Sequence, residues 1–381
     1  MKYDFDVCFV GLKCYDLLSG AAVPRFLGGV EKQLVALAEG MVEGGLRVAF
    51  ITYDHGQQDI EQHKGISVFK SFSQDAGLPV VRFFHPRMTR IWSTMKKVNA
   101  RVFVQMGSGS ETGQVASGCR YFTHQPASFL FCVASDADCS PDLPFLPVLR
   151  EKILYRYGLR ASDAIVAQSH KQQQMLQDTF SLDSKVIPMP FNGPDESTYV
   201  APAPPGPGVI SVLWVGRIID VKRLEWLLDM AEACPDYQFD VVGTPNQESD
   251  YSQGLYDRAA GIKNVTLHGR VGEKELPGFF KRASVLCCTS IIEGFPTTFM
   301  EAWSYGLPIV TSFDPDNMIA RNELGFVDGT VDGLVKALNS LFSDSELWQQ
   351  FSTRARQYYL QNHTLGAVTP RFIKVMENIG R

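Results

Sequence analysis

Short apolar runs rich in β-branched residues alternate along this chain with stretches whose apolar positions recur every three or four residues. This alternation predicts βα units that build parallel sheets, and so an α/β fold. In the first half we expect a helix over 31–43 and strands at residues 7–11, 48–53, 66–69, 102–106, 121–124 and 164–168. In the second half we expect strands at residues 210–215, 239–242, 265–268, 285–289 and 309–311. The helices expected there are 224–233, 274–282, 297–305, 334–342 and 347–360, with a separate terminal piece over 369–380.

A cluster of prolines and glycines separates the two halves. Four prolines and two glycines lie between residues 202 and 208. Proline there resists both a helix and a central strand, so we interpret the stretch as a linker of limited flexibility. A length of 381 residues fits two domains. We therefore predict a first domain over 1–196, a linker over 197–208, a second domain over 209–365 and a terminal segment over 366–381.

The composition excludes several classes of protein. Hydrophobic residues make up 45% of the chain and charged residues 20%, which is typical of a folded globular protein and not of a disordered one. The net charge of −5 argues against a general nucleic-acid binder. The apolar runs are too short to span a bilayer, and the acidic opening residues do not resemble a secretory signal.

Eight cysteines are present, and none forms a Cys-x-x-Cys pair. Several of them lie inside apolar runs, where a free cysteine packs as a small buried side chain. We therefore expect a reducing, cytoplasmic setting with no disulfide framework and no zinc site.

Two basic residues follow the apolar strand that opens the second half. The strand ends at Gly216, and Arg217 and Lys222 lie in the loop after it. Loops at the carboxyl ends of parallel strands face the ligand crevice of open α/β sheets. Arginine and lysine there suit a diphosphate. A solvated basic loop before a helix is the alternative, and the local pattern does not separate the two.

A second motif follows the strand expected at 285–289. Gly294 and Pro296 mark a turn, and Pro296 suits the first position of a helix that begins near Thr297. The N–H groups at such a helix start attract anionic groups. Glu293 lies on the loop and Glu301 lies about one turn into the helix, so both carboxylates could accept hydrogen bonds from sugar hydroxyls. Capping or pairing of Glu301 with a neighbouring base is the alternative. Against it, the helix around Glu301 looks buried, and a buried acid needs a specific partner.

Together these motifs resemble glycosyltransferase family 4, a group of retaining, nucleotide-sugar-dependent enzymes with the GT-B fold. The resemblance rests on Gly-Arg217-x4-Lys222, on Glu293-Gly-Phe-Pro-x4-Glu301-Ala and on Gly306-Leu-Pro. It extends more loosely to Gly28-Gly29 before the first helix. It implies two Rossmann-like parallel-sheet domains that face each other across a cleft. It also implies a terminal helix that crosses back and packs on the first, acceptor-binding domain.

By position, the resemblance assigns the donor diphosphate to Arg217 and Lys222, the sugar hydroxyls to Glu293 and the ribose to Glu301. His124, expected at the end of a strand, resembles the active-site histidine of the family, although a lone histidine is more often structural. The catalytic set is then Lys222, Arg217, Glu293 and His124. The other donor-binding positions are Gly28, Gly29, Gly216, Arg270, Val271, Gly294, Phe295, Pro296, Thr297 and Thr298.

The implied reaction is the transfer of a hexose from a nucleotide diphosphate sugar to a hydroxyl of a glycan or lipid-linked acceptor, in cell-surface polysaccharide synthesis. We favour a UDP-sugar. Catalysis would proceed by front-face attack, through charge stabilisation and positioning. We expect no cofactor and no metal. The three Asp-x-Asp triplets at 4–6, 136–138 and 314–316 are short enough to arise by chance.

Two other hypotheses for the function stay open. One is a nucleotide-sugar epimerase on the same architecture, which would change the donor without an acceptor. The other is a non-catalytic nucleotide-sugar-binding subunit, which would bind without turnover. The sequence also lacks a Gly-x-Gly-x-x-Gly turn after the first strand, which disfavours a dehydrogenase.

One basic segment suggests a membrane face. Residues 82–101 hold six lysines and arginines and no acid, with apolar residues at 88, 91, 92 and 95. Such a helix can lie on an anionic membrane, which would place the protein at the inner face of the membrane. Packing of the apolar face on the first domain is the alternative and is more common for amphipathic helices.

Overall fold

The computed structural model describes residues 2–21, 25, 28–78, 82–206, 210–245 and 248–379. The chain divides into two compact units, residues 1–192 with 364–381 and residues 193–363. Part of the predicted linker, residues 207 and 208, lies outside the described residues. The start of that linker packs on the second unit, because the Tyr199 ring lies 3.9 Å from the Arg356 guanidinium. Glu196, the last residue of the predicted first domain, also pairs with Arg356 and so belongs to the second unit.

A parallel sheet forms the centre of the first unit. Its strand order is β3-β4-β2-β1-β5-β6-β7-β8, and only the β3–β4 pair is antiparallel. The strands are β1 (Phe5–Val10), β2 (Val48–Thr52), β3 (Ile60–His63), β4 (Ile66–Lys70), β5 (Ala100–Met106), β6 (Ser128–Cys132), β7 (Ala164–Ala167) and β8 (Lys185–Val186). The central strands are buried on both faces. Their sequences are therefore continuously apolar and do not alternate between apolar and polar residues.

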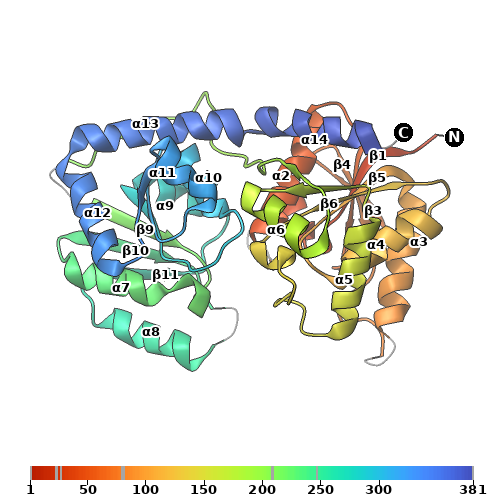
Figure 1. Ribbon diagram of the computed structural model, residues 1–381, viewed down its shortest axis with the longest axis horizontal. Coiled ribbons are helices and arrows are strands. Elements are labelled where there is room, and N and C mark those ends of the chain that lie inside the picture. The colour runs from red at the N-terminus through yellow and green to blue at the C-terminus, as the bar shows by residue number, and fades with distance from the viewer. Residues whose placement is uncertain are drawn as a thin grey trace. The chain divides into compact units, whose positions relative to one another are not determined.

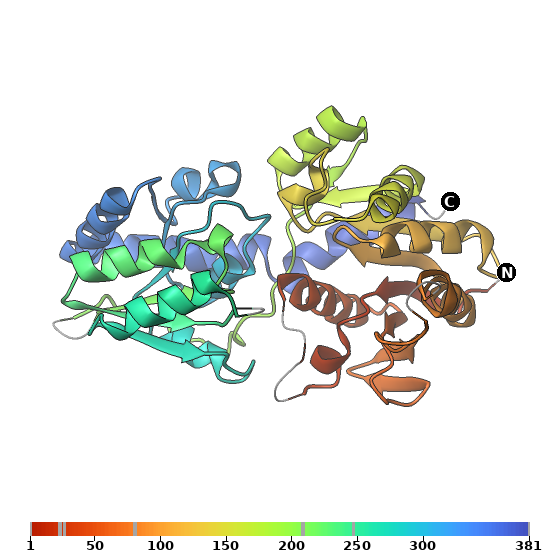
Figure 2. The same cartoon turned by 90° about the horizontal axis from the view of Figure 1, so that it is seen from below.

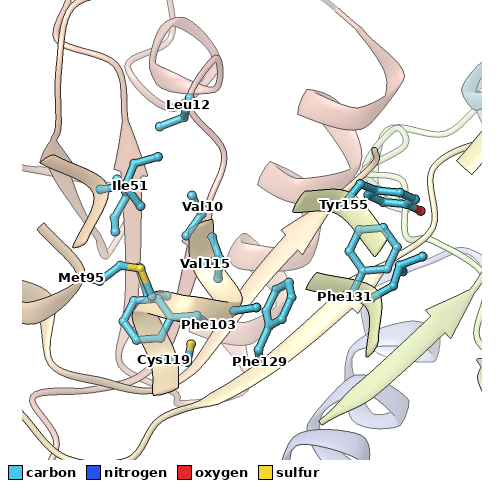
Figure 3. Close-up of a cluster of buried hydrophobic side chains, with 14 of the residues drawn as sticks. Val10, Leu12, Ile51, Met95, Phe103, Val115, Cys119, Phe129, Phe131 and Tyr155 are labelled. Carbon is cyan, nitrogen blue, oxygen red and sulfur yellow. The ribbon is translucent and has the colours of Figure 1, made fainter. Parts of the chain in front are cut away.

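Helices cover both faces of this sheet. They are α1 (Tyr15–Leu18), α2 (Gly29–Glu43), α3 (Thr89–Val98), α4 (Ser110–Tyr121), α5 (Leu149–Ala161), α6 (His170–Phe180) and α14 (Leu365–Ile379), with short turns η1 (Phe83–Met88) and η2 (Asp136–Cys139). Helices α3 to α6 share one core cluster, and α1, α2 and α14 share the other. Figure 3 shows the first cluster, where Met95, Cys119 and Tyr155 gather around Phe103 and Phe131.

The last helix packs on the first unit. Helix α14 runs beside α2, although the two come from opposite ends of the chain (Figure 1 and Figure 2). Its side chains Phe372 and Met376 are fully buried, and the Ser128 hydroxyl donates to the Ile379 carbonyl at 2.7 Å. The chain therefore returns to its first unit after completing the second.

The apolar face of the basic segment is buried in the core. Ile91 and Met95 of α3 are 0% exposed, and Trp92 stacks on Phe122 with ring centroids 3.9 Å apart. The alternative that this face packs on the first domain is therefore confirmed. The predicted membrane face at 82–101 is wrong in its apolar part, because a side chain that fills the core cannot enter a bilayer. None of the helices in the described ranges is both long and apolar enough to cross a membrane.

The second unit repeats the architecture with a six-stranded parallel sheet of order β11-β10-β9-β12-β13-β14. The strands are β9 (Ile210–Val215), β10 (Tyr237–Val242), β11 (Val265–Gly269), β12 (Val285–Cys288), β13 (Ile309–Thr311) and β14 (Gly325–Val327). The helices are α7 (Leu224–Ala233), α8 (Asp250–Ala260), α9 (Leu276–Arg282), α10 (Thr297–Ser304), α11 (Met318–Asn322), α12 (Val331–Ser343) and α13 (Ser345–Asn362), with turns η3 (Asp220–Lys222) and η4 (Pro315–Asn317). Figure 1 shows α7 and α8 on one side of this sheet and α9 and α10 on the other.

One predicted strand is wrong. Residues 121–124 do not form a strand, because Tyr121 ends α4 and a bend follows before β6. Gly113 of α4 and Gly158 of α5 let the two helices pack closely: a Cβ on Gly113 would lie 2.5 Å from the Leu154 carbonyl oxygen. Residues 110–121 thus form a helix that packs on α5, and the chain leaves it at the amino edge of the sheet. The sequence reading also missed β6, whose Ser-Phe-Leu-Phe-Cys run is the true strand here.

Candidate active site

The two motifs of the second half meet at one edge of the second sheet. Strand β9 is the first strand of the second unit, and its neighbours in the sheet are β10 on one side and β12 on the other. The strand order therefore reverses between β9 and β12. Ligands of open α/β sheets bind outside the carboxyl ends of the strands at such a reversal. The loop with Arg217 and Lys222 leaves β9 there, and the loop with Glu293 leaves β12.

Lys222 and Glu293 form an ion pair across these loops. The Lys222 Nζ donates to Oε1 of Glu293, although the residues lie 71 positions apart in the chain. The two side chains are 20% and 14% exposed, respectively. Water screens charges at such half-buried positions less than at the surface, so the pair holds both groups at the strand ends. The structure thus brings together two of the residues that the resemblance assigns to catalysis.

A buried threonine joins the two loops. Thr289 is 0% exposed, and its hydroxyl donates to the Lys222 carbonyl at 2.7 Å while accepting from Trp214 Nε1 at 3.2 Å. The Ile291 amide adds a bond of 2.9 Å to the Val221 carbonyl. These bonds fix the backbone of Lys222 to the segment that carries Glu293. The sequence reading missed Thr289, since it appeared only as the last residue of an apolar strand.

Arg223 strengthens the same junction. Its guanidinium donates to the Thr289 carbonyl at 2.7 Å and to the Ser312 hydroxyl at 2.9 Å, and it lies 3.6 Å from the Trp226 ring centre. Its backbone is left-handed with φ of 47°, a conformation that costs a non-glycine residue about 1 kcal/mol or more. Desolvation lowers the pKa of this guanidinium, which nevertheless stays charged at neutral pH. Arg223 is therefore a structural cation beside Lys222.

Arg217 is exposed at the carboxyl end of β9. Within the described ranges, no residue hydrogen-bonds or ion-pairs with its guanidinium, which is thus available to an anion. The backbone beside it is tightly constrained. A Cβ on Gly243, which has φ of 142°, would lie 1.7 Å from the Gly216 carbonyl oxygen. The loops after β9 and β10 consequently contact each other backbone to backbone.

Helix α10 begins at Thr297, as predicted, but Pro296 precedes it as the N-cap and is not the first helical residue. No side chain caps this helix start. Gly294, Thr297 and Thr298 are partly exposed beside it. The Phe295 side chain instead points into the core against Trp303, so only its backbone can line a ligand site.

Glu301 is 4% exposed in the second turn of α10. Burial, and next the Glu301 carboxylate, raise the pKa of the neighbouring Tyr305. The predicted burial of this acid is confirmed.

Arg270 and Val271 follow β11, the edge strand of the sheet, two strands away from β9.

The first unit places its predicted residues at two different edges. Gly28 is the N-cap of α2, and Gly29 begins that helix, which follows β1 and so starts at the carboxyl edge of the first sheet. His124 lies at the opposite edge, in the bend that precedes β6. Its neighbour Gln125 donates to Asn99, the residue before β5. The premise that His124 ends a strand is therefore wrong, and its assignment as an active-site residue loses its basis.

In each of the three Asp-x-Asp triplets, one aspartate accepts hydrogen bonds from other residues of the protein. Asp6 accepts from the Arg47 guanidinium at 2.9 and 3.1 Å. Asp138 accepts from the amides of Ala134 and Ser135, and Asp314 accepts from the amide of Ile319 at the start of α11. These three carboxylates stabilise loops and helix ends.

Residues 204–358 match the family model described as glycosyl transferases group 1. The chain is 29% identical over 195 residues to the lipopolysaccharide 1,6-galactosyltransferase of Salmonella typhimurium, a match that covers 47% of this chain and 52% of that relative. The chain spans about half or less of the length of the first curated relatives that it matches.

Two solved structures match nearly the whole chain. Sucrose-phosphate synthase from Thermosynechococcus elongatus has a TM-score of 0.77, with 16% identity and 98% of each chain covered. Anabaena HepE in complex with UDP-glucose has a TM-score of 0.73, with 16% identity and coverage of 98% of this chain and 100% of that one. These matches establish the GT-B fold that the resemblance implied.

Proposed function

We propose that this protein is a retaining glycosyltransferase, because residues 204–358 match the family model described as glycosyl transferases group 1 and the chain has the GT-B fold. It moves a hexose from a nucleotide diphosphate sugar to a hydroxyl of a glycan or lipid-linked acceptor. The observation that carries the proposal is the Lys222–Glu293 pair at the carboxyl ends of β9 and β12, with the exposed Arg217 on the same loop. A cation pair for a diphosphate and a carboxylate for sugar hydroxyls thus share one sheet edge.

The proposed chemistry is charge stabilisation. As the bond between the sugar and the diphosphate breaks, negative charge grows on the leaving diphosphate. Lys222 and Arg217 stabilise that charge, and Glu293 orients the sugar through its hydroxyls. The leaving diphosphate takes the proton of the acceptor hydroxyl, so the acceptor attacks from the same face and configuration is retained. Burial, and next the Glu293 carboxylate, raise the pKa of the Cys288 thiol, which disfavours a thiolate nucleophile at this site.

A UDP-sugar is the proposed donor, and a cell-surface glycan is the proposed acceptor. HepE holds UDP-glucose in one matching structure, and one matching relative is a lipopolysaccharide galactosyltransferase. Thermal-shift measurements with UDP, GDP and ADP and their sugars test the donor, because a ligand of the native state raises its melting temperature. Product analysis by NMR tests retention through the anomeric configuration of the new bond.

Incubation with donor alone separates the proposal from an epimerase, which would convert the donor without any acceptor. Binding of a UDP-sugar without transfer over a broad panel of acceptors would instead support a binding subunit.

Transfer is expected to persist in excess EDTA, since in this proposal two side-chain cations, Lys222 and Arg217, stabilise the diphosphate. The measurement is the initial rate before and after chelation. Loss of activity that manganese restores would contradict this expectation.

A further inference from the structure

Helix α5 carries an apolar stripe on its outer face. Leu149, Ile153 and Tyr157 follow one another at intervals of four residues and are 69%, 57% and 37% exposed. The opposite face of the same helix supplies Tyr155 and Leu159 to the core, where both are nearly fully buried. The core therefore already accounts for one apolar face of α5. The outer stripe needs a separate explanation, because large apolar side chains in a row are not expected in water.

The stripe continues into neighbouring segments. Phe145 and Val148, which lead into α5, are 66% and 44% exposed, and Tyr121 at the end of α4 is 64% exposed. Helices α4 and α5 lie side by side (Figure 1), and Gly158 lies so close to α4 that a Cβ there would meet the Thr112 backbone at 2.5 Å. We call the resulting surface the α5 patch, defined by Tyr121, Phe145, Val148, Leu149, Ile153 and Tyr157.

Basic residues surround the α5 patch. They are Arg120 from α4 and Arg150, Lys152, Arg156 and Arg160 from α5, whereas Glu151 is the one acid that α5 contributes. The Lys152 and Arg156 side chains donate to the backbone carbonyls of Asp142 and Pro141, contacts that leave their positive charge in place. This rim is positive on a chain whose net charge is −5. An apolar, aromatic centre with a positive rim thus lies on this surface of the first unit.

The chemistry of the α5 patch selects its occupant. A second copy of the chain placed by two-fold symmetry would bring the same basic residues face to face, and like charges in contact are unfavourable. An anionic bilayer matches both parts of the surface. Its headgroups attract the basic rim, and exposed leucine, isoleucine, phenylalanine and tyrosine side chains can enter the boundary between headgroups and acyl chains.

We propose that the α5 patch docks on the surface of an anionic lipid bilayer. This membrane face differs from the one expected at residues 82–101, whose apolar side chains lie in the core. The docking does not depend on the identity of the sugar donor, so it can hold or fail independently of the proposed transfer reaction.

The test is flotation of the full chain with lipid vesicles. One set consists of phosphatidylcholine, and the other contains phosphatidylglycerol in addition. The chain should float with the anionic vesicles only, and binding should weaken as salt screens the charges. Leu149→Ser with Ile153→Ser should weaken binding at least about tenfold, because two inserted side chains are lost. Arg120→Glu with Arg160→Glu should do the same, since each basic residue near the surface contributes on the order of 1 kcal/mol.

A matched variant controls for general surface effects. Val200→Ser with Lys336→Glu removes an exposed apolar group and reverses an exposed charge in the second unit, and it should float like the wild type. Melting temperatures within a few degrees of wild type confirm that each variant folds. Equal flotation with both vesicle sets, or flotation of the Leu149→Ser, Ile153→Ser variant at the wild-type level, would overturn the proposal. A dimer in light scattering that this variant disrupts would identify the patch as an interface between chains, which also overturns it.

Discussion

The two units share a parallel-sheet architecture, yet each holds an ion pair at a different edge of its sheet. In the second unit, Lys222 and Glu293 meet at the carboxyl ends of β9 and β12. In the first unit, Asp6 and Arg47 meet at the amino ends of β1 and β2, where Arg47 also donates to the Tyr3 carbonyl. The carboxyl edge is where parallel sheets bind ligands. The same interaction is therefore expected to serve turnover in one unit and stability in the other.

The two edges also differ in the kind of sequence pattern that predicted them. Several residues at fixed spacing marked the carboxyl edge of the second unit, and two of them, Lys222 and Glu293, form an ion pair there. In the first unit, the one residue assigned to catalysis was a histidine, and it lies at the amino edge. A motif of several residues limits the folds that can contain it. The predicted position of a single residue, in contrast, depends on the element assigned to its neighbours, and the strand expected at 121–124 does not form.

Lys222→Ala should have the largest effect. Removing a cation that stabilises the leaving diphosphate should lower kcat by about a hundredfold to a thousandfold. Initial rates with a UDP-sugar measure the loss, and circular dichroism checks that the fold persists. Lys336→Ala, which removes an exposed lysine of the same unit, is the matched control and should keep the wild-type rate. A wild-type rate for Lys222→Ala would contradict the assignment of Lys222 to the donor diphosphate.

Thr289→Val should come next, with about a tenfold loss of kcat. The substitution removes the hydroxyl that links Trp214 Nε1 to the Lys222 carbonyl, and it leaves those buried groups unpaired at a cost of about 1–3 kcal/mol. Thr289→Ser keeps the hydroxyl and should restore kcat. Thr311→Val is the matched control, because Thr311 is equally buried on β13 but bonds only to Phe313. If Thr311→Val reduced kcat as strongly as Thr289→Val, the link to Lys222 would not be the cause.

Arg47→Ala should reduce stability and leave kcat unchanged. The hydrogen-bonded Arg47 guanidinium lowers the pKa of Asp6, so ionised Asp6 stabilises the native state above its unfolded pKa. This contribution is lost as the pH falls through the lowered native pKa. Because both side chains are partly exposed, we expect a loss of about 1 kcal/mol or less at pH 7. Urea unfolding at pH 7 and near pH 3 measures it, and a difference that stays constant between the two pH values would contradict the stated cause.

His124→Ala should have the smallest effect. The side chain is exposed in the bend before β6, at the amino edge of the sheet, so kcat should stay within about twofold of wild type. The same assay as for Lys222→Ala provides the measurement. A hundredfold loss would restore the histidine to the active site and remove the contrast between the two edges.

The sequence alone predicted several local elements of the second unit closely, although it missed α8, α11 and β14. Strand β9 and helix α7 have the predicted bounds, and α10 begins at the predicted residue. Hydrophobic periodicity is a local property, and a helix or strand that buries one face must show it in its own residues. The same locality placed Lys222 and Glu293 on loops after strands, and hence at the ligand-binding edge.

The tertiary structure decided what depends on residues far apart in the chain. Residues 110–121 form α4, which packs closely on α5 at Gly113, and His124 follows this helix at the amino edge of the sheet, where parallel sheets do not bind ligands. Thr289 and Arg223 acquire their roles only because β9 and β12 are neighbours in the sheet. Both α3 and α5 carry apolar faces, but only packing reveals that Ile91 is buried while Ile153 is exposed. Periodicity states that a face is apolar, and only the fold determines what covers it.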